Sequence, residues 1–176
     1  FGSDSLTNYE IGARTRLFDR TLTLDATLFY IDWQDIQLLS VRGDNMAYAT
    51  NVGAARNVGV DLMSDWRPTP NLTLTGSVGY LDGKLLDDIN TGATTAKAGT
   101  RLPGASRWRI ASTASYRFDA PYDPTVMVLY RYVSSAPSDL SGTVWQGGYG
   151  VLDLRVQGQF GGTRVEGFVE NVGDRQ

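Results

Sequence analysis

The chain has 176 residues, of which 41% are hydrophobic and 20% are charged, so we expect a folded unit rather than a disordered segment. Glycine is frequent at 20 residues and aromatic residues make up 11%, which favours strands and tight turns over helices. The sequence contains no Cys and no His, which excludes disulfides, thiolate nucleophiles and the usual zinc ligand and general base. We therefore expect no enzyme, no metal and no other cofactor, and the net charge of −3 disfavours nucleic acid as a partner.

Apolar and polar side chains alternate along eight segments, as is typical of strands with two different faces. The predicted strands are 6–17, 21–33, 57–66, 72–81, 107–118, 125–133, 150–160 and 163–171. Short turns alternate with three long loops at 34–56, 82–106 and 134–148. In an antiparallel up-and-down sheet, alternate connections lie at the same end. The short turns are therefore expected at one end of the sheet and the long loops at the other.

One face of each predicted strand carries no charged side chain, and its aromatic residues lie near the two ends of the strands. The expected long-loop rim contains Tyr9, Tyr30, Tyr80, Trp108, Tyr130 and Tyr132, and the short-turn rim contains Trp66, Tyr116, Phe118 and Phe160. Aromatic rims around an aliphatic band are typical of the two interfaces of a membrane, whereas the core of a soluble β-sandwich also holds large rings at its centre. The pattern therefore predicts a membrane β-barrel whose polar face lines the lumen.

Several short motifs, in their order along the chain, resemble the TonB-dependent outer-membrane receptors, specifically the C-terminal part of their barrel. They are Tyr9-Glu10-Ile11-Gly12-Ala13-Arg14, 28–37, 51–55 with 59–62, 72–80, Gly99-Thr100-Arg101-Leu102-Pro103 and Asn171-Val172-Gly173-Asp174. The hairpin after Asp19 departs from the family by having Arg20 where Gly is common, so we expect an irregular turn there.

The resemblance implies an all-β fold in which this chain supplies about eight strands of a larger barrel of about 22 strands. Residues 1–176 would then be a partial barrel domain, and the plug domain and the final strand would be absent. The implied location is the outer membrane of a Gram-negative bacterium. The implied function is TonB-energised uptake of a scarce solute such as a ferric siderophore. The implied partners are outer-membrane lipid, the plug domain, the solute and, through the missing N-terminal part, the TonB system.

Two other interpretations remain open from the residues. Eight strands suffice to close a small outer-membrane barrel with a structural or adhesive role, although the polar face lacks the bulky side chains that would fill its interior. A soluble β-sandwich could bind carbohydrate through loop aromatics such as Trp33, Tyr48 and Trp145.

Polar residues near the expected lumen mouth are the candidate ligand-binding residues. Arginines are prominent among them, and guanidinium groups bind anionic groups with bidentate geometry. The candidates are Arg56, Asn57, Asp61, Arg107, Arg109 and Arg131. Pairing of these arginines with lumen carboxylates or with the plug is the simpler structural explanation. The acidic stretch 82–90 lacks the spacing of a calcium loop and is expected to be solvated.

Overall fold

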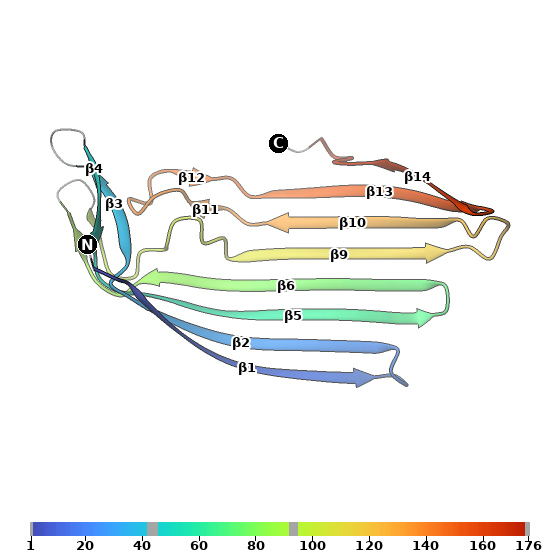
Figure 1. The fold of residues 1–176 in the computed structure, drawn as a ribbon, viewed down its shortest axis with the longest axis horizontal. Coiled ribbons are helices and arrows are strands. Elements are labelled where there is room, and N and C mark those ends of the chain that lie inside the picture. Colours follow the sequence, from blue (N-terminus) through green and yellow to red (C-terminus); the bar gives the residue numbers. More distant parts are fainter. Residues whose placement is uncertain (1, 42–45, 92–94, 175–176) are drawn as a thin grey trace.

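The computed structural model describes residues 2–41, 46–91 and 95–174. Eight long antiparallel strands in this part of the chain form a single sheet in the order β1-β2-β5-β6-β9-β10-β13-β14 (Figure 1). Their bounds are β1 Ser5–Leu17, β2 Leu22–Gln34, β5 Ala55–Thr69, β6 Leu72–Leu85, β9 Trp108–Arg117, β10 Thr125–Val133, β13 Tyr149–Phe160 and β14 Thr163–Val169. None of the residues described here belongs to a helix long and apolar enough to cross a membrane.

Each of the eight predicted strands corresponds to one long strand of the sheet, so the all-β, antiparallel prediction is confirmed. The four short turns lie together at one end and the long connections at the other (Figure 1). The turn between β1 and β2 is irregular, as expected, because Phe18, Asp19 and Arg20 all have positive φ angles of 51°, 52° and 69°. The Thr21 amide and hydroxyl both donate to the Phe18 carbonyl and close this turn.

The three long connections contain two-stranded hairpins that the sequence analysis missed. They are β3 Gln37–Val41 with β4 Ala47–Asn51, β7 Ile89–Asn90 with β8 Thr95–Ala96, and β11 Ala136–Pro137 with β12 Trp145–Gln146. Alternation over two to five residues is too short a pattern to distinguish a strand from a loop. Residues 42–45 and 92–94, which belong to two of these connections, lie outside the described residues.

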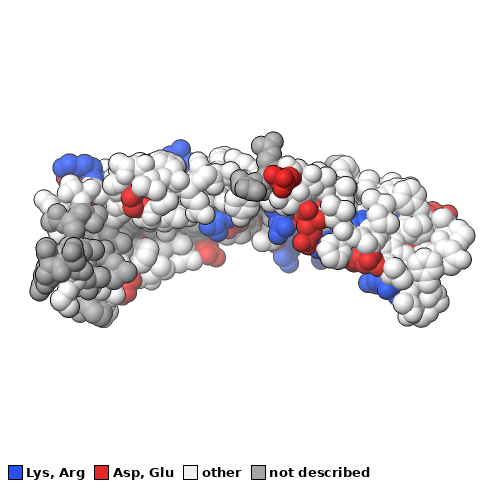
Figure 2. All heavy atoms as spheres, turned by 90° about the horizontal axis from the view of Figure 1, so that it is seen from above, with Lys and Arg blue, Asp and Glu red and all other residues white. Residues whose placement is uncertain are grey.

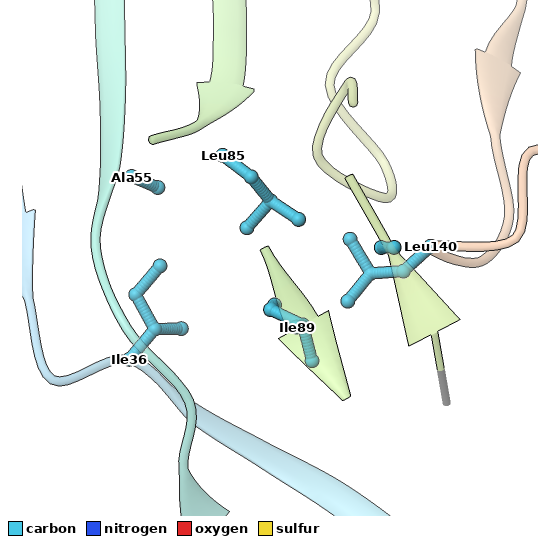
Figure 3. Close-up of a cluster of buried hydrophobic side chains, with 6 residues drawn as sticks. Ile36, Ala55, Leu85, Ile89 and Leu140 are labelled. Atoms are coloured by element: carbon cyan, nitrogen blue, oxygen red, sulfur yellow. The ribbon is translucent and has the colours of Figure 1, made fainter. Parts of the chain in front are cut away.

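A small apolar core lies among these connections rather than within the large sheet (Figure 3). Ile36, Ala55, Leu85, Ile89 and Leu140 come from different connections and strand ends, and their side chains meet in one cluster. Ala55 is fully buried and Leu85 is 2% exposed. This group, with Ala96, is called the loop core below.

The large sheet is open and forms a single layer, which Figure 2 shows as a thin arch. Within the described residues, β1 pairs with β2 and β14 pairs with β13, and neither outer strand has a second neighbour. Nor does another sheet of the described part cover the apolar face, where Ile11 is 71% exposed. The described residues therefore form an open, single-layered sheet rather than a closed eight-stranded barrel or a two-layered sandwich.

Candidate functional site: the polar wall of the sheet

The polar face of β5, β6, β9 and β10 is hollowed near its long-loop end. The hollow has a volume of about 510 Å³, and its lining includes Asp61, Gly79, Arg109 and Arg131. Asp61 pairs in register with Gly79, and Gly79 pairs with Arg109 on its other side. The three residues therefore form one row across the sheet, with a carboxylate and a guanidinium on either side of a glycine.

Gly79 is the position that opens this row. A Cβ atom at Gly79 would lie 3.0 Å from the Asp61 carboxylate oxygen, so the glycine leaves room for Asp61 to lean over the strand. Asn57 has the same relation to Gly83, where a Cβ atom would lie 2.5 Å from the Asn57 side-chain oxygen. Gly79 thus opens a polar notch between β5 and β9, defined by Asp61, Gly79 and Arg109, while Asn57 and Gly83 lie four residues farther along β5 and β6.

Arg109 supplies positive charge to this notch. No carboxylate in the described part of the chain forms an ion pair with it. Other arginines of the polar face are paired: Arg14 with Asp25, and Arg155 with Glu166 at 3.4 Å and Glu170 at 3.6 Å. Arg109 is therefore the candidate residue best placed to bind an anionic group.

Arg131 lines the same hollow but is already paired. Its guanidinium lies 2.9 Å from the Asp153 carboxylate, whose side chain is 3% exposed. The other Asp153 oxygen accepts a hydrogen bond from the Asn171 amide at 2.9 Å. This arrangement matches the structural explanation, in which the arginine neutralises a buried carboxylate.

Two of the six candidates interact away from the notch. Arg56 directly precedes Asn57 in β5, so its side chain points to the opposite face of the sheet, the apolar face that also carries Val58. The Arg107 guanidinium lies 3.9 Å from Asp82, which also pairs with Lys84 at 2.8 Å. The structure therefore places Asp61 and Arg109 on either side of Gly79, puts Asn57 four residues farther along β5, and separates Arg56 from them on the other face.

Partners within the chain bind the carboxylates of the acidic stretch 82–90. The Asp87 carboxylate accepts a hydrogen bond from the Ala54 backbone amide at 2.9 Å. The Asp88 carboxylate accepts hydrogen bonds from the Lys97 ammonium at 2.7 Å and from the Ala98 backbone amide at 2.9 Å. The hydrogen bond from Lys97 lowers the pKa of Asp88 below its ordinary value of 3.8, with the Ala98 amide as the next cause. These carboxylates fasten the loop end of the structure.

Several of the aromatic residues predicted for the two rims form ring pairs on the apolar face. Tyr9 and Tyr30 pair in register with their centroids 6.4 Å apart, and Tyr80 and Trp108 pair at 4.8 Å. At the short-turn end, Tyr116 and Phe118 are 4.8 Å apart. Tyr122, which the sequence analysis did not select, stacks on Phe160 at 4.6 Å. A tyrosine within a turn carries no periodic signal, so its partner was visible only in the structure.

The sequence of residues 5–172 matches the family described as "TonB dependent receptor-like, beta-barrel". No curated protein is similar enough in sequence to match the chain. The fold is similar to that of the ferric yersiniabactin uptake receptor FyuA from Yersinia pestis, with a TM-score of 0.79 and 23% identity. That alignment covers 98% of this chain and 25% of the receptor.

Two further solved structures have the same fold. The siderophore receptor PiuA from Acinetobacter baumannii aligns with a TM-score of 0.78 and 19% identity over 96% of this chain and 24% of that receptor. The copper transporter OprC aligns with a TM-score of 0.71 and 20% identity over 97% of this chain and 25% of the transporter. The chain therefore spans about a quarter of the length of each of these proteins.

Proposed function

This chain belongs to the TonB-dependent receptor family as part of its β-barrel, and on that premise we propose that it forms a wall of an outer-membrane receptor for a ferric siderophore. Members of this family are outer-membrane receptors and transporters of Gram-negative bacteria. The whole protein would bind the solute from outside and import it with energy passed through the TonB system. A plug domain elsewhere in the protein would close the lumen.

The match to the family over residues 5–172 is the observation that carries the proposal. The apolar face adds independent support for the membrane location, because its exposed aliphatic band lies between two aromatic rims. Lipid would cover this band as solvent covers the polar face. The exposed β1 and β14 edges would pair with further strands of the barrel, since unpaired backbone groups cannot face lipid.

The polar notch supports an anionic solute. Arg109 offers guanidinium donors and forms no ion pair with a carboxylate among the described residues. Many ferric chelates are anionic, and the proteins with this fold include a ferric yersiniabactin uptake receptor, a siderophore receptor and a ferric-catecholate import receptor. A copper transporter shares the fold, so copper chelates are the competing solute class.

Uptake by cells tests the proposal directly. Cells that lack the full-length receptor, and the same cells supplied with it, are given radioactive iron bound to a panel of siderophores, or copper bound to chelators. We expect the receptor to raise iron uptake from at least one siderophore, and to lose this effect when the proton-motive force is dissipated. Receptor-dependent copper uptake without iron uptake would contradict the assignment to siderophores.

A single substitution tests the notch. In the full-length receptor, Arg109→Gln should weaken siderophore binding and flatten its dependence on salt, because a solvated charge contributes mainly through screened attraction. Arg164→Gln is the matched control, since Arg164 lies on the polar face near the short turns. Unchanged affinity and an unchanged salt dependence for Arg109→Gln would remove the notch from the binding site.

A further inference from the structure

A row of charged side chains crosses the apolar face just beyond the aromatic rim at the long-loop end. Arg56 pairs in register with Lys84, and Lys84 forms an isolated bridge with Arg101. Arg56 and Lys84 share this face with Val58 and Tyr80, because alternate residues of a strand point to the same side. This group, with Arg107, is called the basic row below.

The basic row carries more positive than negative charge. Its four cations are accompanied by two carboxylates: Asp82, which pairs with Lys84 and Arg107, and Asp32, which lies beside Arg56 in register. Burial and the nearby positive charge of Arg107 both lower the pKa of Arg101, burial being the larger cause. An added anion between these cations would relieve their mutual repulsion.

An apolar groove runs from the basic row into the aromatic rim on the same face. It has a volume of about 590 Å³, and Arg56 and Asp82 lie at its head. Its walls include Tyr9, Leu28, Tyr30, Val60 and Tyr80. Aromatic rings of this kind mark the depth of the lipid headgroups in a barrel, so the basic row lies at the level of headgroup phosphates.

We propose that the basic row binds the phosphate of an outer-leaflet lipid and that the groove holds the first part of one of its acyl chains. Arginine and lysine bind phosphate through charge-assisted hydrogen bonds, and their long stems let the charged groups reach the headgroup level. A free phosphate ion would satisfy the cations but leave the apolar groove empty, which favours a lipid. The inference rests on the proposed function only for the membrane orientation of the sheet.

Native mass spectrometry of the full-length receptor tests the inference. The receptor is released from micelles that contain a phosphorylated glycolipid, lipid A, or the same lipid with its phosphates removed. We expect the intact lipid to be retained, and Lys84→Gln with Arg101→Gln to weaken retention by about tenfold. Lys84→Arg with Arg101→Lys keeps both charges and should retain the lipid.

Removal of two positive charges from the polar face near the short turns, Arg67→Gln with Arg164→Gln, provides the matched control and should leave retention unchanged. Equal retention of the dephosphorylated lipid, or displacement of lipid A by millimolar inorganic phosphate, would overturn the assignment to a phosphorylated lipid. Iron uptake by the same variants separates the two proposals. Uptake without lipid retention in the parent receptor would overturn only this inference, whereas absence of the receptor from the outer membrane would overturn both.

Discussion

Apolar side chains are exposed on one face of the large sheet but buried in the loop core. On the apolar face of the sheet, Ile11 and Leu28 are 71% and 54% exposed, whereas in the loop core Leu85 and Ile36 are each 2% exposed. The proposed outer-membrane location explains the difference. Apolar side chains on the sheet would need no protein cover if lipid surrounds them, whereas those of the connections, which would lie in water, pack together and so reduce their contact with it.

The connections are consequently tied to each other rather than to the sheet face. Ile36 follows β2, Leu85 ends β6, and Leu140 lies in the connection between β10 and β13. Three connections far apart in the sequence thus share one core, as the close-up shows (Figure 3). In the proposed receptor, this core would hold the long-loop end as one unit above the membrane.

The largest effect is expected from a charge placed in the lipid-facing band. Leu74→Arg should destabilise the full-length receptor in lipid vesicles by about 2–4 kcal/mol, because the guanidinium would have to leave water. Leu24→Arg should behave in the same way. The free energy of unfolding in urea is the measurement.

Neighbouring residues on the polar face are the matched controls for that comparison. Thr75 follows Leu74 directly and lines a hollow of about 400 Å³, so Thr75→Arg should cost much less. Thr27→Arg plays the same role for Leu24. Equal damage on both faces would show that the apolar face does not meet lipid.

A cavity in the loop core should loosen the connections without affecting the strands. Leu85→Ala removes a buried side chain and should cost about 2 kcal/mol locally. Hydrogen exchange of the full-length receptor should become faster in the three connections and stay unchanged in the middle of β5 and β6. Leu86→Ala is the control, since Leu86 is 41% exposed. Equal effects of the two substitutions would mean that the loop core does not stabilise the connections.

A smaller loss of stability is expected from a substitution at Asp153, which lies on β13 near the end of β14. Asp153→Asn should reduce the free energy of unfolding by about 1 kcal/mol, because Arg131 would lose its charged partner while the Asn171 amide could keep an acceptor. Hydrogen exchange near residues 169–172 should report the change. Glu170→Gln is the control, because the Glu170 side chain is 59% exposed. A result in which Glu170→Gln is the more damaging would contradict the assigned role of Asp153.

The smallest effect concerns pH at the loop end. The pKa of Asp88 is lowered in the folded protein, so its contribution is present above pH 3.8 and is lost as the pH falls through the lower folded value. The Ala98 amide, which donates to Asp88, should therefore lose protection from exchange only in strongly acidic solution. Asp88→Asn should remove this pH dependence, and its persistence in the variant would assign it to another group.

The sequence by itself determined the class of fold, the eight long strands and the two faces of the sheet. Strands of seven or more residues repeat the alternation often enough for the pattern to be read, and β10 has the predicted bounds of Thr125–Val133. The placement of aromatic residues near the two strand ends of the apolar face followed from the same alternation, because each residue adds a fixed rise along a strand. The irregular turn at Asp19 and Arg20 was visible for a local reason, since Arg is a poor residue for positive φ.

Only the tertiary structure decided which charged residues meet. Cross-strand register placed Gly79 between Asp61 and Arg109, and the same register put Arg56 beside Lys84 on the other face. Register likewise placed Arg131 of β10 diagonally across from Asp153 of β13, and the chain after β14 returns to β13, where the Asn171 backbone amide donates to the other Asp153 oxygen. The loop core joins side chains from connections up to about a hundred residues apart, and no local pattern specifies such contacts because each hairpin is too short to show a period.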